Sequence, residues 1–203
     1  MKRIVLFSYL LDALRPTLLP QIFPADLAGK VFAYMPSDGS LKGGRYQRFH
    51  EIWQELAEEN GAEFVPIDNS LVEAEAERER EKLRGANILM ITGGNTCVLL
   101  RNLRRSGLDQ EILALANKDQ YVLAGFSAGA MVFTPTIQLS TFGPYEEDNK
   151  EVGLTDFTAL NLVDYEVFPH YAEDTQETFE AYSKIATHPV KPLGDAEFLV
   201  IER

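Results

Sequence analysis

The sequence predicts an α/β fold, a doubly wound and mostly parallel sheet with helices on both faces, similar in kind to other ligand-binding α/β domains. Short apolar or β-branched runs alternate along the chain with longer segments of helical period. Most of these runs are apolar on both faces, as strands covered by helices on each side require. In such sheets ligands bind at the carboxyl ends of the strands. We expect a single domain that spans residues 1–203.

The expected strands lie at residues 4–7, 31–35, 63–67, 88–92 and 121–124. An amphipathic helix is predicted from the three- and four-residue spacing of Tyr46, Phe49, Trp53, Leu56 and Ala57, with Gly61 as its C-terminal cap. Residues 73–84 are almost entirely charged and predict a helix with a solvated face. Leucines and Ile112 between residues 99 and 115 indicate two helices separated near Gly107.

The composition limits which partners the protein is expected to bind and in which cellular compartment it is expected to lie. With 25% charged residues and a net charge of −12, the chain is a poor candidate for binding nucleic acid or an anionic membrane. Its single cysteine, Cys97, excludes an internal disulfide, and the N-terminal segment lacks the pattern of a signal peptide. No apolar run is long enough to span a bilayer. A cytoplasmic location is therefore expected, and a homodimer is compatible with a sequence that leaves the oligomeric state open.

The stretch from Tyr121 to Ala130 carries the strongest functional signal. A buried-strand pattern runs into Gly125-Phe-Ser-Ala-Gly129 and then into a helix-compatible segment. This order is typical of a nucleophile elbow, in which a sharp turn between strand and helix exposes a serine hydroxyl and glycines allow close backbone approach. A structural tight turn is the alternative. The agreement of strand, turn and helix favours Ser127 as a nucleophile.

A second motif, Gly93-Gly-Asn-Thr96, follows the preceding predicted strand. Two glycines before a helix start expose backbone N–H groups, and Asn95 or Thr96 can cap the helix. If this loop lies beside the serine, the N–H groups of Gly94 and Ala128 can stabilise one developing negative charge. By itself the motif is also compatible with a plain glycine turn.

A serine nucleophile needs a base, and the chain has three histidines. His50 lies on the amphipathic helix and His188 near a predicted helix end. His170 follows the strand-like run of residues 162–169, which places it at a strand's carboxyl end, on the same rim of the sheet as Ser127. It is the expected general base. Spacing alone leaves several carboxylates open as the group that orients its ring: Glu146, Glu147, Asp148, Glu151, Asp156 and Asp164.

Five segments together resemble the peptidase E family of serine peptidases, relatives of cyanophycinase. They are Gly93–Thr96, Gly125–Ala130, Pro135–Ile137, Ala159–Leu162 and Pro169-His170. The resemblance covers nearly the whole chain. It implies a fold similar to class I glutamine amidotransferase domains, with serine in place of cysteine. It also implies that Ser127 is the nucleophile, that His170 is the base, and that Gly94 and Ala128 donate to the oxyanion.

The resemblance implies a third catalytic group, an aspartate, but counting residues from Ser127 and counting residues from His170 place it at different positions. Counted forward from the serine, the family's aspartate falls on Phe142; counted back from His170 without gaps, it falls on Asp148. An insertion around residues 142–146 reconciles the counts, so Asp148 is the expected acid and Glu147 the second choice. The family's arginine-bearing stretch after the histidine corresponds here to residues 175–182, which contain no arginine. The best-known members of the family cleave dipeptides with an N-terminal aspartate, and this specificity is therefore not carried over.

The leading hypothesis is a serine peptidase that hydrolyses short peptides in the manner of a dipeptidase, without a metal or an organic cofactor. Two alternatives remain: a non-catalytic, amidotransferase-like module that binds a ligand on the same rim, and an amidase or esterase that uses the same Ser-His pair. Geometry separates the first alternative from an enzyme. A hydrogen bond from Ser127 to His170, with a carboxylate at the other ring nitrogen, would favour catalysis.

Overall fold

The computed structural model describes residues 1–203 except 28, 40, 42–46, 146 and 151, and only the backbone at residues 144 and 147. Its main sheet has six strands in the order β3-β2-β4-β5-β1-β8. Neighbouring strands are parallel except for β8, which runs antiparallel to β1. The strands are β1 (Lys2–Phe7), β2 (Val31–Met35), β3 (Glu63–Pro66), β4 (Ile88–Ile91), β5 (Tyr121–Phe126) and β8 (Phe198–Glu202). This arrangement confirms the predicted α/β class.

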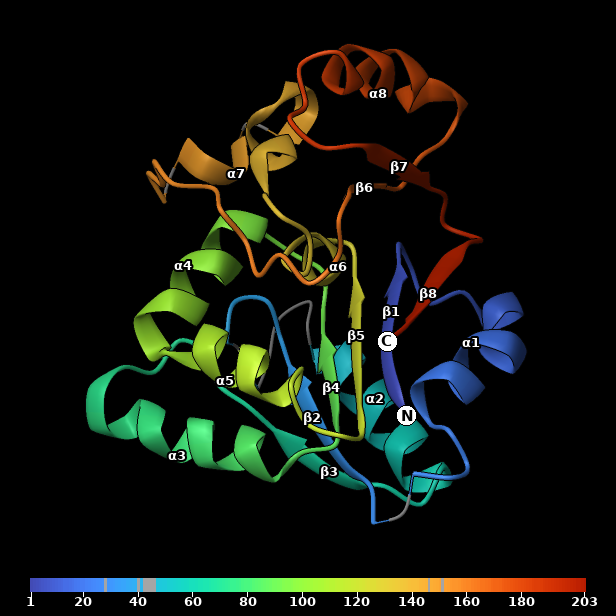
Figure 1. Ribbon diagram of the computed structural model, residues 1–203, viewed down its shortest axis with the longest axis vertical. Coiled ribbons are helices and arrows are strands. Elements are labelled where there is room, and N and C mark those ends of the chain that lie inside the picture. Colours follow the sequence, from blue (N-terminus) through green and yellow to red (C-terminus); the bar gives the residue numbers. More distant parts are fainter. Residues whose placement is uncertain (28, 40, 42–46, 146, 151) are drawn as a thin grey trace.

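Helices cover both faces of the main sheet (Figure 1). One face packs against α1 (Arg15–Ile22) and α2 (Gln47–Glu59), and the other against α3 (Glu73–Gly85), α4 (Thr96–Ser106) and α5 (Leu108–Leu115). The remaining helices are short. They are α6 (Ala128–Met131), α7 (Glu147–Lys150) and α8 (Gln176–Ser183), with 3-10 turns at Asp12–Leu14, Gln138–Thr141, Gly143–Tyr145 and Glu173–Thr175. Among the described residues, no helix has the length and apolar character that crossing a bilayer requires.

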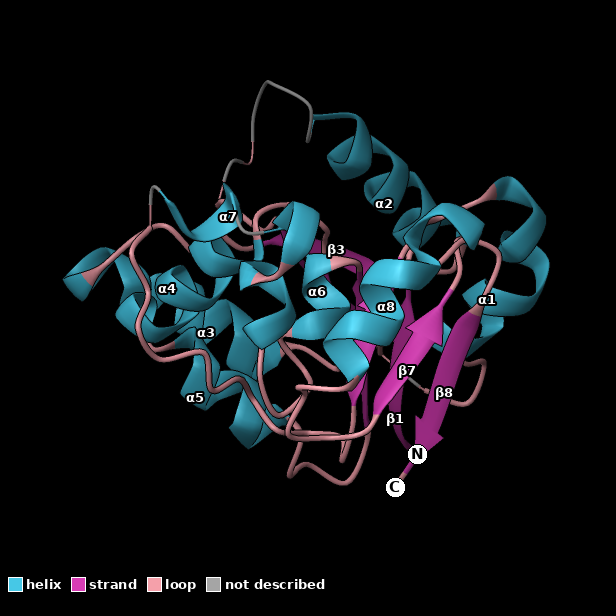
Figure 2. Ribbon diagram, turned by 90° about the horizontal axis from the view of Figure 1, so that it is seen from above, coloured by secondary structure: helices cyan, strands magenta, loops and turns pink. Residues whose placement is uncertain are grey.

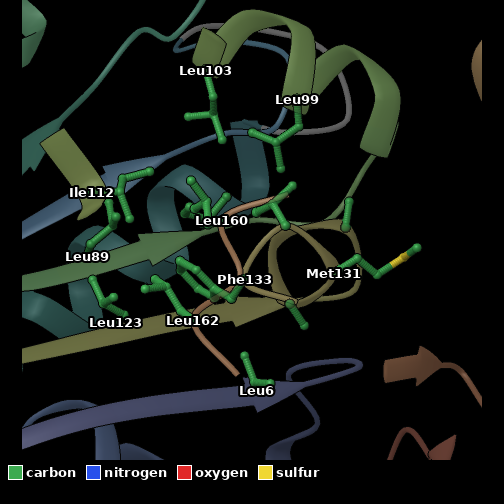
Figure 3. Close-up of a cluster of buried hydrophobic side chains, with 14 of the residues drawn as sticks. Leu6, Leu89, Leu99, Leu103, Ile112, Leu123, Met131, Phe133, Leu160 and Leu162 are labelled. Carbon is green, nitrogen blue, oxygen red and sulfur yellow. The ribbon is translucent and has the colours of Figure 1, made fainter. Parts of the chain in front are cut away.

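The alternation of side chains along the strands divides the apolar core into two clusters. Ile4 and Leu6 of β1 belong to the cluster beneath α3, α4 and α5, whereas Val5 and Phe7 belong to the cluster beneath α1 and α2. Figure 3 shows the first cluster, in which Leu6, Leu89 and Leu123 of three adjacent strands face Leu99, Leu103 and Ile112 of the helices. Because both faces are buried, the central strands read as continuous apolar runs.

The element boundaries follow the sequence patterns closely. The strand predicted at residues 121–124 extends to Phe126, and β1 begins at Lys2 rather than residue 4. Gly61 and Gly107 both have positive φ, 67° and 74°, at the helix ends where they were expected. Asn95 is the N-cap of α4, because its side chain accepts a hydrogen bond from the N–H of Val98 at 2.8 Å. Tyr46, part of the predicted amphipathic pattern, lies outside the described residues.

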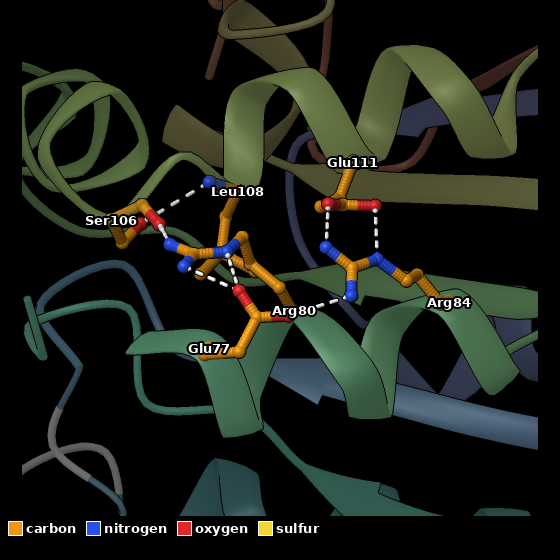
Figure 4. Close-up of polar contacts among 6 residues, drawn as sticks. All are labelled: Glu77, Arg80, Arg84, Ser106, Leu108 and Glu111. Atoms are coloured by element: carbon orange, nitrogen blue, oxygen red, sulfur yellow. Dashed lines mark hydrogen bonds and ion pairs between the residues drawn. The ribbon is translucent and has the colours of Figure 1, made fainter. Parts of the chain in front are cut away.

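The charged helix α3 is tied to α5 through its basic side chains (Figure 4). Arg84 bonds Glu77 on its own helix and Glu111 on α5, at 2.7 and 2.6 Å. Arg80 bonds Glu77 and the carbonyl of Ser106. These partly exposed pairs each contribute little to stability. They fit the prediction of a solvated helix face rather than a binding tract.

A second, two-stranded sheet lies above the carboxyl ends of the main sheet (Figure 1). It pairs β6 (Glu166–Pro169) in parallel with β7 (Val190–Leu193), and α8 connects the two. Figure 2, drawn from above, shows α8 and β7 over the main sheet. The expectation that His170 ends a strand of the same sheet as Ser127 is therefore wrong: its strand belongs to the smaller sheet. The shorter, partly exposed β7 carries too little apolar pattern to reveal that sheet from the sequence.

Glu166 of β6 is buried in this second layer. Its Oε2 accepts a hydrogen bond from the hydroxyl of Tyr182, while Oε1 has no hydrogen-bond partner and lies 3.7 Å from His188 Nδ1. Burial raises the pKa of the Glu166 carboxyl above its usual value, although the Tyr182 hydroxyl opposes the rise. The folded protein therefore holds this proton more tightly than the unfolded chain does.

Replacing Glu166 by Gln is expected to stabilise the protein at neutral pH. The raised pKa stabilises the folded protein fully at pH values below the pKa that the carboxyl has in the unfolded chain. This contribution is lost as the pH rises through the pKa that the carboxyl has in the folded protein. A neutral amide removes that loss, so thermal melting at pH 8 should rise by roughly 2–4 °C, the shift that about 1 kcal/mol gives a domain of this size. The gain should shrink toward pH 4. The exposed Glu177→Gln variant is the control; a gain that persists at pH 4 would contradict the titration argument.

Candidate active site

Ser127 lies in the sharp turn between β5 and α6. Its backbone has φ 51° and ψ −116°, and its N–H donates to the carbonyl of Phe7 on β1 at 2.9 Å. The flanking glycines are required by space: a Cβ at Gly125 would collide with the carbonyl of Gly129, and one at Gly129 would collide with the carbonyl of Ile91. The turn therefore holds a strained serine against the carboxyl ends of β4 and β1.

The structure brings Ser127 and His170 together. His170 follows β6, also with a positive φ of 57°, and its Nε2 lies 2.8 Å from Ser127 Oγ. The other ring nitrogen, Nδ1, lies 2.7 Å from Oδ1 of Asp195. With the ring proton on Nδ1, the imidazole donates to the carboxylate and accepts from the serine hydroxyl. The three side chains thus form one hydrogen-bonded chain.

The carboxylate at His170 differs from both predicted acids. Asp148 belongs to α7 and contacts the N-terminus of α4. Its Oδ2 accepts from the N–H of Thr96 at 3.3 Å, and its carbonyl accepts from the Asn95 side chain at 2.8 Å. Burial raises the pKa of the Asp148 carboxyl. Glu147 begins α7, and its side chain lies outside the described part of the chain. Asp148 thus supports the Gly93-Gly94 loop, and the prediction that it orients His170 is corrected to Asp195.

Ser8, which follows β1, forms hydrogen bonds that hold the backbone of His170 in place. Its fully buried Oγ accepts from the backbone N–H of His170 at 3.0 Å and donates to the carbonyl of Leu193 at 2.6 Å. Leu193 ends β7, two residues before Asp195. The Glu197 side chain accepts from the Gly194 N–H at 2.9 Å and fixes the turn that carries the acid. One hydroxyl thus connects the loops that bear the base and the carboxylate.

Removing the Ser8 hydroxyl is expected to lower kcat about tenfold for any substrate that Ser127 attacks. Ser8→Ala leaves the His170 N–H without its acceptor and loosens the spacing between His170 and Asp195, and small misplacements of reacting groups are costly. The measurement is kcat and KM together with a thermal melt. Ser106→Ala is the matched control, because that hydroxyl is also buried but bonds only backbone groups of α4 and the N–H of Leu108, among the residues that the structure describes. An equal loss of kcat in both variants would contradict a positioning role.

The Gly93-Gly94 loop lies directly against the serine. A Cβ on Gly93 would be 3.0 Å from Ser127 Cβ, and Gly94 has a φ of 147° that favours glycine. The N–H groups of Gly94 and Ala128, the two predicted oxyanion donors, make no hydrogen bond to any other residue that the structure describes. The loop and the helix start therefore present free donors beside the serine.

The neighbouring aromatic rings pack against other rings and do not lie between Ser127 and His170. Phe126 is nearly buried against Phe7 and Phe49, with ring centroids 5.5 and 5.3 Å away, and Phe142 packs on Tyr182 at 5.4 Å. Neither interrupts the 2.8 Å contact between serine and histidine. A non-catalytic module would instead be expected to have these rings filling the space between the serine and the histidine.

Cys97 and the other two histidines, His50 and His188, lie in positions that indicate structural rather than catalytic roles. Cys97 is buried in α4 beside Ser140, and burial raises the pKa of its thiol, as expected for a structural cysteine. His50 packs edge-on against Tyr34 and Phe64, and burial lowers the pKa of its imidazole. His188 lies between α8 and β7. His170 is thus the histidine that the fold places at Ser127.

Two site residues were missed by the sequence reasoning. The search for the acid covered only the segment between Ser127 and His170, whereas Asp195 comes later in the chain. No sequence pattern marks it, because Gly194-Asp195 follows residues 190–193, whose parallel pairing with the strand before His170 is seen only in the structure. Carboxyl ends of paired parallel strands lie together, so the two side chains meet. Ser8 likewise follows β1, the strand beside the nucleophile's own.

Comparison with known proteins places this chain in a family. The model of peptidase family S51 matches residues 14–202. An uncharacterized peptidase of Listeria monocytogenes, Lmo0363, is 31% identical over 186 residues, which cover 88% of this chain and 85% of that protein. Peptidase E of a Nostoc species is 32% identical over 127 residues, 62% of this chain but only 47% of the cyanobacterial protein.

Solved structures share the fold. A crystal structure from Listeria monocytogenes, provisionally described as a peptidase E protein, superposes with a TM-score of 0.74 and 27% identity over 99% of this chain and 94% of that one. A peptidase from an acI-B1 actinobacterium gives a TM-score of 0.70 at 21% identity, over 99% and 83% of the two chains, and this likeness concerns the fold alone. The chain therefore belongs to peptidase family S51 and is a serine-type peptidase.

Proposed function

We propose that the protein hydrolyses short peptides through Ser127, His170 and Asp195. The observation that carries the proposal is the unbroken chain of hydrogen bonds from the serine hydroxyl through both ring nitrogens to the carboxylate, 2.8 and 2.7 Å long. This is the arrangement of roles found in serine hydrolases of unrelated folds. Membership of family S51 supports peptide-bond hydrolysis as the reaction.

Each group has a defined role in the proposed reaction. Ser127 Oγ attacks the scissile carbonyl while His170 Nε2 takes its proton, and Asp195 holds the ring and stabilises the imidazolium. The N–H groups of Gly94 and Ala128 donate to the oxyanion of the tetrahedral intermediate, in positions where single donors are typically worth a few kcal/mol. His170 then protonates the leaving amine. Water, activated by the same histidine, releases the acyl group and restores the serine.

The geometry argues against the non-catalytic alternative, because a binding module has no need of a complete Ser-His-Asp chain. An amidase or esterase would use the same groups. The second layer supports a small substrate, because β6, β7 and α8 lie above the edge of the main sheet where Ser127 follows β5 (Figure 1). A cytoplasmic location, a homodimer and a single domain stay predictions; fractionation, light scattering and limited proteolysis test them.

Labelling with a fluorophosphonate tests the mechanism, and a substrate panel tests the class. We expect the probe to modify Ser127, mapped by mass spectrometry, and the labelling rate to fall sharply in His170→Ala. Dipeptides and short peptides with varied first residues should be hydrolysed faster than simple esters or side-chain amides of matched size. An unlabelled Ser127 in folded protein would refute the proposal. Labelling with turnover of the esters alone would assign the amidase or esterase activity instead.

A further inference from the structure

A cavity of about 430 Å³ lies at the carboxyl end of β1 and has no part in the chemistry described above. It is formed by the segment that follows β1 and by the first turns of α2. Its apolar walls include Leu10 and Ile52, and its aromatic walls are Tyr9 and Phe49. Arg15, Arg48 and Asp12 supply its charged groups.

Both aromatic walls connect directly to the catalytic groups. The ring of Phe49 packs on Phe126, the residue before Ser127, with 5.3 Å between ring centroids. On the other side, Tyr9 follows Ser8, whose hydroxyl accepts the His170 N–H, and its ring lies 6.4 Å from that of Phe49. Phe126 and Ser8 thus connect the walls of the cavity to Ser127 and His170.

The charges in the cavity favour an anion. Arg15 pairs with Asp12 at 3.1 Å, and its Nε has no hydrogen-bond partner. Arg48 is exposed and forms no ion pair with any carboxylate that the structure describes. Two guanidinium groups against one carboxylate leave a net positive charge, in a chain whose overall charge is −12. Guanidinium groups bind carboxylates through paired, charge-assisted hydrogen bonds.

The segment after His170 has the opposite character. Glu173, Asp174 and Glu177 are exposed there, within seven residues of the base. Carboxylates attract an ammonium group and repel an anion. The cavity and the segment that follows His170 thus carry opposite charges, which matches a short peptide with a free amino group at one end and a free carboxylate at the other.

We propose that the cavity at Arg48 and Arg15 is a subsite for the C-terminal carboxylate of the substrate, so that short peptides with a free C-terminus are preferred. This inference rests on the proposed function, because it deepens the substrate class of the same site. The leaving residue lies in the cavity with its carboxylate at the guanidinium groups and its side chain against Phe49 and Ile52. The amino terminus lies toward the acidic segment that follows His170.

A matched pair of substrates tests the subsite: one di- or tripeptide with a free C-terminus and the same peptide as its C-terminal amide. For the unmodified protein, kcat/KM should be about 10- to 100-fold higher for the free acid, mostly through KM, as expected for a charge-assisted hydrogen bond. Arg48→Gln, and more so Arg48→Gln with Arg15→Gln, should bring this ratio close to one. Arg105→Gln, the same change at an exposed site on α4, should leave the ratio unaltered.

A binding measurement separates failure of the subsite from failure of catalysis. Calorimetry on Ser127→Ala should show the same preference for the free acid over the amide, lost again with Arg48→Gln. If neither peptide is hydrolysed but this binding preference is present, the proposed reaction fails and the subsite stands. Equal kcat/KM and equal affinity for acid and amide, or a preference that persists in the double arginine variant, would overturn the subsite while leaving the proposed peptidase activity intact.

Discussion

Replacing Ser127 by Ala, or His170 by Ala, is expected to reduce kcat for short peptides by about 10⁴- to 10⁶-fold, because each removes one half of the nucleophile and its base. The double variant should be no worse than either single one, since groups that act as a unit lose their whole contribution at the first deletion. The measurement is single-turnover hydrolysis with purified variants, with KM followed in parallel.

Folding must be shown to survive these changes. Alanine accepts the backbone of Ser127 no worse than serine does, so the thermal melt of Ser127→Ala should match that of the unmodified protein. His170→Ala keeps the backbone N–H that donates to Ser8. Retained activity in a folded Ser127→Ala protein would exclude this serine as the nucleophile. Losses that multiply in the double variant would indicate that the two side chains act independently.

Replacing Asp195 by Asn is expected to reduce kcat by about 10⁴-fold with KM nearly unchanged. The amide can donate a hydrogen bond to Nδ1, which favours the ring tautomer whose proton lies on Nε2 and which therefore cannot take the proton of Ser127. It also removes the negative charge that stabilises the imidazolium. The geometry behind this expectation is the 2.7 Å contact between His170 Nδ1 and Asp195 Oδ1.

Asp148→Asn is the matched comparison, because both substitutions convert an aspartate near the site to its amide. Asp148 contacts the Thr96 N–H rather than the histidine, so its loss should weaken the Gly93-Gly94 loop and lower kcat far less than Asp195→Asn does. The two variants are compared by kcat and by fluorophosphonate labelling rate. The opposite order of effects would restore Asp148 as the orienting acid.

The sequence predicted the parts of this structure in which a local pattern and a global requirement coincide. The strand before Ser127 is apolar on both faces because two helical layers cover it, and the glycines at 125 and 129 follow from backbone contacts that exclude any Cβ. Asn95 as a cap and Gly107 as a break follow from local chemistry alone. Ser127 and His170 were found for the same reason: each follows a recognisable strand.

The acid could not be found in that way. Asp195 follows a four-residue strand in which Lys191 and Pro192 are exposed. The sequence therefore has no apolar run that would predict this strand. Its role depends on the pairing of β7 with β6, a contact between segments that lie on opposite sides of α8. The choice of Asp148 relied on counting residues, and a count carries no information about which loops meet in space.

The hydrogen bonds of Ser8 have a consequence for the time at which the enzyme becomes active during synthesis. Ser8 is synthesised 185 residues before Leu193, whose carbonyl it holds, and Asp195 follows Leu193 by two further residues. A growing chain can fold the sheet around Ser127 long before its proposed acid exists. The proposed site is therefore completed only when the segment that carries Asp195 docks against β1.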